Sequence, residues 1–376
     1  MLEEGTYSSV QNVKYRKYRR VLLKSLGLKA PKKFGEKALI LAKGLNLLNR
    51  ELRVQRLNDY VYVPLIGDAS SKKLEEIKKR ISDVEIGIYT FNRSAKQIGA
   101  WWRHLEDRLP PHLLASIPHS IDFVGDVAII ELSSELTPYK KQIGEALLVA
   151  NKRIKTVLVK AGAVGGTYRL REFEVIAGEK KTTTVYKEDG CIFYIDLAKT
   201  YFSPRLSYEH QRITSLVNEG ETILDMFAGV GPFAIHIAKK HENVRVYAVD
   251  INPEAVKLLE KSIFANRVVD KVTALLGDAR EIVAGRIRGI ADRVVMNLPE
   301  NALAFVDVAC EALKPRGGVI HYYEFAETPN PMGKAKLRLV EAVEKSNRHV
   351  EKVLTSRLVR PIAPFTWQIV VDAQIK

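Results

Sequence analysis

Two glycines within an apolar stretch place the strongest constraint on how this chain folds. The stretch TILDMFAGVGPFAIHIAKK, residues 222–240, starts as an apolar run that ends in Asp225, passes through Gly229 and Gly231, and continues with helix-like spacing. A glycine-containing turn between a strand and a helix lets a ligand lie directly against the backbone. The stretch therefore predicts a strand, a ligand-binding turn and a helix, in that order.

The residues from 201 onward repeat this alternation of strand and helix. Helix-length amphipathic stretches separate six strand candidates, which are TILDMFA, RVYAVDI, VTALLGD, DRVVMNL, GGVIHYYEF and TWQIVVDAQI. The alternation predicts an α/β fold with a doubly wound, largely parallel sheet that binds ligands beyond the carboxyl ends of its strands. We expect this Rossmann-like domain to cover residues 201–376.

Two further domains are expected before residue 201. Residues 1–66 combine a basic start, the helix-like stretch GEKALILAKGLNLL and a strand pair around Asn58 and Asp59, which predicts a small α/β domain with a basic extension. GDASSKKLEEIKKR then reads as a linker that enters a helix. Residues 81–200 mix strands with the amphipathic stretch PYKKQIGEALLVANKR and the hairpin turn KEDG, which predicts an α+β domain.

Basic residues are spread along the chain rather than confined to a tail. The 376 residues carry a formal net charge of +15, and Lys and Arg gather in VKYRKYRR (13–20), KAPKK (29–33), KKLEEIKKR (72–80) and NKRIK (151–155). Positive charge on several parts of a chain suits a large folded polyanion better than a small one. We therefore expect a nucleic acid as the partner.

The sequence disfavours several other classes of protein. No apolar run is long enough to span a bilayer, and the first residues, MLEEGTYSSV, have no signal-peptide core, so we expect a soluble, cytoplasmic protein without a membrane partner. Cys191 and Cys310 stand far apart without a metal-like spacing partner, and no carboxylate cluster is evident. We therefore expect neither a disulfide nor a metal site.

Three successive strand candidates end in an acidic residue. Asp225 ends the first, Asp250 in YAVDINP ends the second, and Asp278 in LLGDAR follows the third. A carboxylate after the second strand can accept hydrogen bonds from the two hydroxyls of a ribose, which both NAD and S-adenosylmethionine contain. Asp278 would then accept a hydrogen bond from the amino group of the adenine.

The glycine turn favours S-adenosylmethionine over NAD. DMFAGVGPFA lacks a third glycine at the dinucleotide spacing and contains no Lys or Arg, so it does not resemble a phosphate-binding turn. A sulfonium compound is itself cationic and needs no cationic neighbour. Gly229 and Gly231 would let its methionine part lie against the backbone, and Asp225 would receive its ammonium group directly or through water.

The fourth strand candidate ends in VVMNLPE, with Asn297 directly before Leu298 and Pro299. An asparagine amide offers two donors and an acceptor, so it can recognise the edge of a nucleobase. Proline stiffens the turn that presents the amide. We therefore expect the group that reacts to arrive beside Asn297.

Together these motifs resemble one family. YFSPRLSYEHQRI (201–213), LDMFAGVGPFAI, YAVDINPEAV, VVMNLPENA and GGVIHYY are similar to the archaeal and eukaryotic tRNA (guanine-37 N1)-methyltransferases. The resemblance continues through YRLREFEVIAGE (168–179). It also reaches GLNLLNRELRVQRLNDYVYVPLI, which looks like that family's first domain, a reader of the tRNA elbow. The residues before about 28 have no match in it.

The resemblance implies methyl transfer from S-adenosylmethionine to N1 of guanosine 37 in tRNA. Because N1 carries a proton at neutral pH, a base must remove it, and a donor must stabilise the charge that develops on O6. By this resemblance Glu209, four residues after the arginine of the SPR motif, is the base, Arg169 faces O6, and Asn297 holds the guanine edge. The chain reads SYEH where family members often read GGER, which places His210 beside the base.

The resemblance and the strand ends together give the predicted cofactor site. It consists of Tyr201, Arg205, Asp225, Phe227, Gly229, Gly231, Asp250, Ile251, Asp278, Ala279 and Asn297. The expected partner is tRNA with guanosine at position 37. We expect a monomer with no obligate protein partner.

Three alternatives stay open at this point. Related wyosine-pathway enzymes use S-adenosylmethionine to transfer its aminocarboxypropyl group or to methylate C7 of imG-14, and the chain could combine such an activity with N1 methylation. A tRNA-binding protein with an inactive transferase fold is a second alternative, and an NAD-dependent oxidoreductase is a third. The presence of Arg169, Glu209 and Asn297 argues against an inactive protein, since the reaction needs these residue types.

Overall fold

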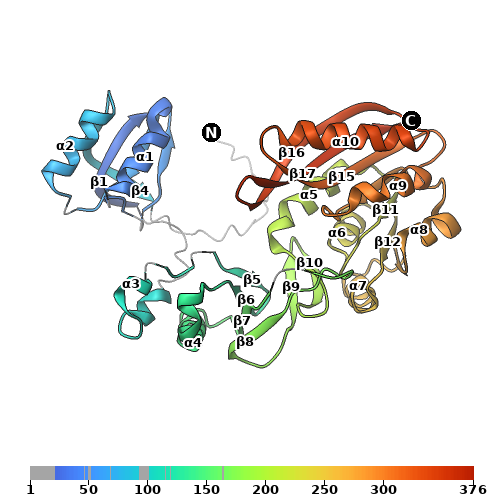
Figure 1. Ribbon diagram of the computed structural model, residues 1–376, viewed down its shortest axis with the longest axis horizontal. Helices are drawn as coiled ribbons and strands as arrows, with labels where there is room; N and C mark the ends of the chain where they lie inside the picture. The colour runs from blue at the N-terminus through green and yellow to red at the C-terminus, as the bar shows by residue number, and fades with distance from the viewer. Residues whose placement is uncertain are drawn as a thin grey trace, which may run out of the picture. The chain divides into compact units, whose positions relative to one another are not determined.

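The computed structural model describes residues 22–45, 47–49, 52–67, 69–92, 101–114, 116–118, 120–162 and 165–376. Contacts divide the chain into two compact units, residues 1–100 and residues 101–376 (Figure 1). The basic start that we predicted as an extension, VKYRKYRR, lies outside the described residues. Within the part of the chain that is described, no helix combines the length and apolarity needed to cross a membrane.

The first unit is a small α/β domain built on one antiparallel sheet. Its strand order is β2-β3-β1-β4, and the predicted strand pair around Asn58 and Asp59 is confirmed, with Asn58 at a φ of 51° in the turn. Two helices pack on the sheet through Ala38, Ala42 and Ile77. The elements are β1 (Leu22–Pro31), α1 (Gly35–Gly44), β2 (Gln55–Leu57), β3 (Tyr60–Pro64), α2 (Ser71–Arg80) and β4 (Glu85–Asn92).

This unit extends further along the chain than we predicted. We placed residues from 81 onward in the middle domain, but β4 pairs along its length with β1 in the first sheet. The predicted linker region contains α2, whose Ile77 is fully buried in the core of the same unit. The boundary therefore moves to the segment after Asn92, because hydrogen bonding and packing tie residues 71–92 to the first unit.

The second unit begins with the predicted α+β region. A four-stranded sheet of order β5-β6-β7-β8 carries α4 (Lys140–Ala150), which joins the parallel strands β6 and β7 and buries Ile143 and Leu147. The strands are β5 (Asp122–Val124), β6 (Val127–Ile130), β7 (Thr156–Lys160) and β8 (Phe173–Gly178), and the short α3 (Pro111–Leu114) precedes them.

The predicted hairpin at KEDG is confirmed. β9 (Thr183–Glu188) and β10 (Cys191–Asp196) pair antiparallel, and Asp189 and Gly190 both have positive φ, at 47° and 80°. Two consecutive residues with positive φ define the type I′ turn, whose twist matches that of the flanking strands. Cys191 and Cys310 are both buried and free.

A seven-stranded sheet forms the rest of the second unit. Its order is β13-β12-β11-β14-β15-β17-β16, in which the first five strands run parallel and β17 pairs antiparallel with β15 and β16. The predicted doubly wound, largely parallel sheet is confirmed. The strands are β11 (Thr222–Asp225), β12 (Arg245–Asp250), β13 (Val272–Leu276), β14 (Arg293–Met296), β15 (Gly318–Glu327), β16 (Val350–Ala363) and β17 (Thr366–Ile375).

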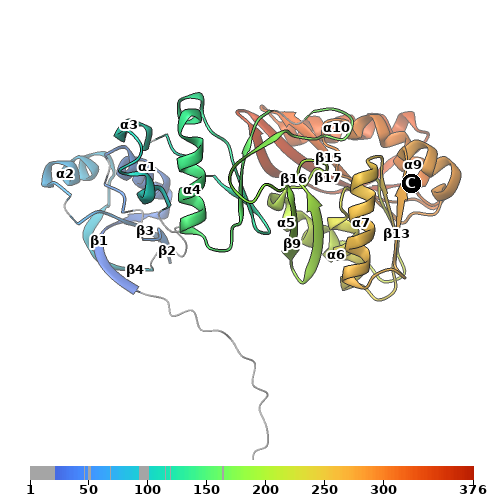
Figure 2. The same ribbon diagram turned by 90° about the horizontal axis from the view of Figure 1, so that it is seen from below.

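Helices cover both faces of this sheet (Figures 1 and 2). Neighbouring residues of β11 point to opposite faces: Ile223 packs into a core with α5, α6 and α7, whereas Leu224 packs into a core with α8, α9 and α10. The strands are apolar on both faces because both are buried. The helices are α5 (Ser207–Leu216), α6 (Pro232–Lys240), α7 (Pro253–Asn266), α8 (Ala279–Ile282), α9 (Val306–Ala312) and α10 (Pro331–Lys345).

The strand order reverses direction at β11. The chain proceeds from β11 to β12 and β13 on one side and then returns to β14 on the other side of β11. The loops after β11 and β14 therefore separate, which opens a crevice at the carboxyl ends of the strands. This topology predicts where a ligand site should lie.

Candidate active site

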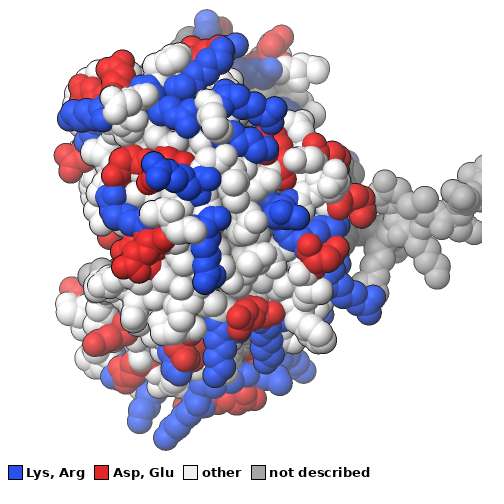
Figure 3. Space-filling model, turned by 90° about the vertical axis from the view of Figure 1, so that its right-hand side faces the viewer, with Lys and Arg blue, Asp and Glu red and all other residues white. Residues whose placement is uncertain are grey.

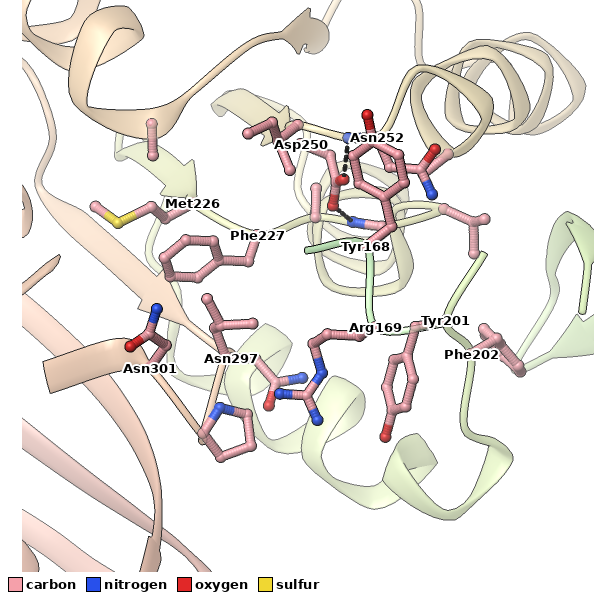
Figure 4. A pocket seen from close by; sticks show the side chains of 18 of the residues that line it. Tyr168, Arg169, Tyr201, Phe202, Met226, Phe227, Asp250, Asn252, Asn297 and Asn301 are labelled. Atoms are coloured by element: carbon pink, nitrogen blue, oxygen red, sulfur yellow. Dashed lines mark hydrogen bonds between the residues drawn. The ribbon is translucent and has the colours of Figure 1, made fainter. Parts of the chain in front are cut away.

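A cavity of about 580 Å³ lies at the carboxyl ends of β11, β12, β13 and β14 (Figure 4). Its size is typical of pockets that hold small ligands. The wall is formed by the loops that follow these strands, by the segment from Tyr201 to Leu206, by the turn 166–169 and by Gln368 of β17.

The glycine turn folds tightly against β12 and α7. Gly229 and Gly231 have φ values of 56° and 85°, a region that side-chain-bearing residues rarely adopt. Gly231 is the N-cap of α6, and a Cβ atom on it would lie 2.2 Å from Cδ1 of Leu259. The turn therefore needs glycine at position 231 for both conformation and space.

Asp250 is held by the turn that it faces. Its Oδ2 accepts a hydrogen bond from the Gly229 backbone N–H at 2.6 Å, and its Oδ1 accepts one from the Asn252 N–H at 2.9 Å (Figure 4). Burial raises the pKa of the Asp250 carboxyl, against these two hydrogen bonds. Each carboxylate oxygen retains acceptor capacity toward the cavity, which suits two vicinal hydroxyl donors.

Asp278 stands at the start of α8 and lines the cavity. Its Oδ1 caps the helix by accepting a hydrogen bond from the Arg280 N–H at 2.8 Å. The cap fixes the side chain, and Oδ2 stays available as an acceptor.

Asp225 lies behind the glycine turn rather than on the cavity wall. Its side chain is fully buried, and neither carboxylate oxygen has a hydrogen bond of normal geometry within the part of the chain that the structure describes. Burial, and secondarily the charge of Asp250, raises the pKa of Asp225 to about 7. Only the backbone N–H groups of Ala234 and Phe227 act against this rise, and a cationic group in the adjacent cavity would compensate the buried charge.

Arg169 projects between Tyr201 and Asn297 (Figure 4). Its backbone is left-handed, with a φ of 54°, and its guanidinium lies over the Tyr201 ring at 5.4 Å from the centroid. Nη2 lies 3.0 Å from Oε1 of Glu300 in an ion pair, but Nη1 is buried without any acceptor among the described residues. An unpaired buried N–H at a cavity wall is the signature of a missing acceptor.

The side chain of Asn297 is oriented by Gln368, a residue of the last strand, β17. Its Oδ1 accepts a hydrogen bond from Nε2 of Gln368 at 3.2 Å, and Oε1 of Gln368 accepts one from Nε of Arg360 at 2.8 Å. Arg360 also donates to the hydroxyls of Tyr201 and Ser203. This network fixes the Asn297 amide so that its NH₂ group remains free to donate.

Glu209 does not line the cavity in this structure. It lies in the first turn of α5 with 2% of its surface exposed, and its Oε2 accepts hydrogen bonds from Nε of Arg212 at 3.0 Å and from the Tyr323 hydroxyl at 2.8 Å. Its Oε1 lies 3.0 Å from Nη1 of Arg357. Its neighbour His210 contributes to the cavity wall instead.

The structure brings together most of the predicted site. The residues that line one cavity are Arg169, Tyr201, Phe227, Gly229, Asp250, Ile251, Asp278, Ala279 and Asn297. Arg205 departs from the prediction. Its guanidinium donates to Asp122 at 2.7 Å and to Ser120 at 2.8 Å, so it joins the turn before α5 to β5 and is not among the residues that line the cavity.

Three family models match the chain in sequence order. The tRNA methyltransferase 5 N-terminal domain matches residues 27–73, the TYW2 N-terminal domain matches residues 102–182, and the TRM5/TYW2 methyltransferase domain matches residues 184–353. The tRNA (guanine(37)-N(1))-methyltransferase Trm5b of Pyrococcus abyssi is 36% identical over 351 residues, which are 93% of this chain and 99% of that protein. This chain belongs to the tRNA (guanine-37 N1)-methyltransferase family.

Solved structures of the family match most of the chain. Trm5 of Methanocaldococcus jannaschii in complex with adenosine is 32% identical, with a TM-score of 0.62 over 93% of this chain and 99% of that one. A complex of aTrm5 with tRNALeu is 33% identical, with a TM-score of 0.64 over 93% of this chain and 100% of that one. As a member of this family, the chain is an S-adenosylmethionine-dependent tRNA methyltransferase.

Several cavity residues of this methyltransferase escaped the sequence analysis. Asn252 caps α7 directly before Pro253, a helix-start signal that could have been used. Phe305 packs edge-on against Phe227 with ring centroids 5.1 Å apart, and Gln368 comes from the last strand. Neither of the latter two has a local signal, because only the tertiary fold brings them to the cavity.

Proposed function

We propose that Arg169, Asn297 and Glu209 carry the methylation of N1 of guanosine 37, with S-adenosylmethionine bound across the glycine turn. The observation that carries this proposal is the unpaired, buried Nη1 of Arg169 beside the oriented amide of Asn297. Together they offer a charged donor and a neutral donor, which match O6 and a second acceptor on a purine edge.

The cavity residues fit S-adenosylmethionine. Asp250 would accept hydrogen bonds from the ribose hydroxyls, Asp278 from the adenine amino group, and the uncompensated Asp225 would attract the ammonium group. Ile251, Ala279 and Phe227 supply apolar contacts around the base, and Tyr201 closes the side that faces Arg169. When bound, the cofactor supplies an electrophilic methyl group.

Arg169 acts by stabilising charge. Loss of the N1 proton places negative charge on O6 of the guanine, and a fixed guanidinium in a site that excludes water is suited to hold it. Stacking on Tyr201 and the ion pair with Glu300 keep the guanidinium in place. The strained backbone at Arg169 is consistent with a position held for function.

Glu209 acts as the base only after its carboxylate turns from its present partners. Arg212, Arg357 and Tyr323 all contact the carboxylate in this structure, so these contacts must be released before the carboxylate can reach a substrate. Arg357 is the partner best placed to leave, since 32% of its side chain is exposed and it stacks on the exposed Tyr208. We propose that binding of the RNA backbone draws Arg357 away and frees the base.

The remaining parts of the chain serve RNA binding in this proposal. The first unit would contact the tRNA elbow, as its family resemblance implies. On the face shown in Figure 3, basic side chains are interspersed with acidic ones, so positive charge is distributed rather than gathered in one patch. We expect a cytoplasmic monomer that acts without a protein partner.

One alternative is favoured by a specific observation. The middle region matches the TYW2 N-terminal domain, and the catalytic model is shared between TRM5 and TYW2. Transfer of the aminocarboxypropyl group, or methylation of a wyosine intermediate, therefore competes with N1 methylation. The match of residues 27–73 to the tRNA methyltransferase 5 N-terminal domain favours N1 methylation.

Parallel incubations with two forms of labelled cofactor separate these activities. With an unmodified tRNA transcript, methyl-labelled S-adenosylmethionine should label the RNA and carboxyl-labelled S-adenosylmethionine should not. Label from the carboxyl form would show aminocarboxypropyl transfer and would overturn the proposal. A transcript with adenosine at position 37 serves as the control and should stay unlabelled in both arms.

A further inference from the structure

Three buried side chains that are not among the proposed cofactor or catalytic residues converge on one point. Glu188 ends β9, His210 lies in α5 and His236 lies in α6, and their exposed fractions are 7%, 1% and 5%. One ligand atom of each lies within 4.8 Å of the ligand atoms of the others. The cluster joins the β9–β10 hairpin to the two helices that flank the glycine turn.

The hydrogen bonds around the cluster fix where the protons are. Nδ1 of His210 lies 2.7 Å from Oε1 of Glu188, and a carboxylate can only accept, so this nitrogen carries a proton. Nδ1 of His236 lies 2.7 Å from the carbonyl oxygen of Pro232, which likewise can only accept. His236 therefore has its proton on Nδ1 and a lone pair on Nε2 when it is neutral.

This lone pair points toward a negative charge. Nε2 of His236 lies 3.5 Å from Oε1 of Glu188, and this nitrogen has no hydrogen-bond partner among the described residues. No lysine or arginine of the described chain forms an ion pair with Glu188, whose ion-pair partners are the two histidines. Two acceptors that face each other in a buried site need a proton or a metal ion between them.

We propose that Glu188, His210 and His236 bind a divalent transition-metal ion of the zinc type. Two imidazoles and one carboxylate are a donor set that Zn²⁺ and Co²⁺ accept readily. The hydrogen bond from Nδ1 of His236 to a backbone carbonyl is the outer contact that metal-binding histidines usually make. The proposal does not depend on the methyl-transfer chemistry, and His210 also lines the cofactor cavity.

The three donor atoms, which lie within 4.8 Å of one another, must draw together to bind an ion. Tetrahedral Zn²⁺ places neighbouring nitrogen and oxygen donors roughly 3.3 Å apart, and the separation of Nε2 of His236 from Oε1 of Glu188 is already 3.5 Å. The ion replaces the hydrogen bond between His210 and Glu188, so the proton on Nδ1 of His210 must move to Nε2 of the same ring. With neutral histidines and ionised Glu188, no net proton is released.

A second cavity gives the ion access and room for a fourth ligand. This cavity is lined by His236, Cys191, Gln211 and Lys239, among others, and is distinct from the cofactor cavity. A water molecule from it can complete the coordination. The three ligands come from β9, α5 and α6. The bound ion would therefore link α5, which carries Glu209, to α6, which follows the glycine turn.

Metal titration of the untagged, chelator-treated protein tests this proposal. We expect one Co²⁺ per chain to give the visible absorption of a four-coordinate site and to be displaced by one Zn²⁺. Glu188→Gln and His236→Gln should each weaken binding by about tenfold or more. His349→Gln, which changes an exposed histidine, should leave the stoichiometry and the spectrum unchanged.

A measurement on the unaltered protein covers the case in which the variants fail to fold. X-ray absorption at the zinc edge should show nitrogen and oxygen neighbours with imidazole scattering and no sulfur. A sulfur neighbour would assign the ion to Cys191 and overturn this donor set. The proposal is also overturned if no stoichiometric metal is taken up, or if nitrogen NMR shows His236 doubly protonated with Zn²⁺ in excess.

Discussion

At the scale of single residues, Glu209 is both the proposed base and one of the most enclosed carboxylates of the described chain. Its contacts with Arg212, Arg357 and Tyr323 hold the carboxylate away from the cavity. A base held in this way cannot accept a proton from the guanine until substrate binding displaces the partners of the base. Such an arrangement would protect the enzyme from unproductive proton transfer before the guanine arrives.

Replacement of this residue tests its role. Glu209→Gln keeps the shape and the acceptor for the Tyr323 hydroxyl but removes the base, so the single-turnover rate should fall on the order of 10²–10⁴-fold. Affinity for tRNA should change by less than about threefold, since a removed base acts only on the chemical step. Glu260→Gln, an exposed glutamate of α7, is the control. An unchanged rate in a folded variant would remove Glu209 as the base.

Asp225 provides a prediction about pH. Its pKa of about 7 in the folded chain lies above the ordinary value of 3.8 because the side chain is buried. The folded state therefore binds the proton more tightly than the unfolded state, and this residue lowers stability as pH rises from about 4 to 7, with no further loss above that. The shift corresponds to roughly 4 kcal/mol.

Asp225→Asn should remove this dependence. The free energy of unfolding of the variant, relative to the wild type, should rise between about pH 4 and 7 and level off above 7, as measured by urea denaturation without cofactor. S-adenosylmethionine should bind the variant more weakly because the negative charge is lost. Parallel stability profiles for the two proteins would show that Asp225 titrates normally.

The residues at strand ends could be predicted, whereas their partners could not. Asp225, Asp250 and Asp278 follow from the strand pattern, since parallel strands end at one edge of the sheet. Gln368 and Arg360 orient Asn297 and Tyr201 across separations of more than 70 residues, so no local signal exists for them. The hydrogen bond from Arg205 to Asp122 could not be predicted either, because the two residues lie 83 positions apart in the sequence.

At the scale of elements, the glycine turn makes a prediction with a matched control. Gly231 and Gly220 have nearly equal φ values, 85° and 84°, but a Cβ atom meets Leu259 at 2.2 Å only in the first case, and nothing lies within 4 Å of it in the second. Gly220→Ala should lower the free energy of unfolding by about 1–2 kcal/mol through backbone strain alone.

Gly231→Ala should cost more than this control, by about 1–3 kcal/mol, because the buried Leu259 must move as well. It should also weaken S-adenosylmethionine binding, which the control should not. Urea denaturation and cofactor titration give the two readouts. Equal losses of stability in both variants would show that the turn accommodates a side chain at position 231.

Among the elements, β16 and β4 show where sequence patterns fail. β16 is an edge strand with four register shifts, and its charged residues and Pro361 break the alternation that marks a strand. The apolar residues of β4 were visible, but its partner β1 lies some 60 residues earlier. The parallel core was predictable because each strand there is a continuous apolar run between helices.

At the scale of the whole molecule, the distributed positive charge predicts how tRNA binding responds to salt. If the protein neutralises several phosphates, the dissociation constant for tRNA should rise by roughly a hundredfold or more between 50 and 200 mM monovalent salt. Affinity for S-adenosylhomocysteine, measured as the control over the same range, should change little. A flat response for tRNA would contradict a large backbone footprint.

The most direct test of the account is mass analysis of a tRNA transcript with guanosine 37 after incubation with the enzyme and S-adenosylmethionine. Nuclease digestion should yield one fragment that is heavier by a single methyl group, and its nucleosides should include 1-methylguanosine from position 37. A transcript with another base at position 37 should remain unmodified. An unmodified guanosine 37, or a methyl group at another atom or position, would contradict the central claim.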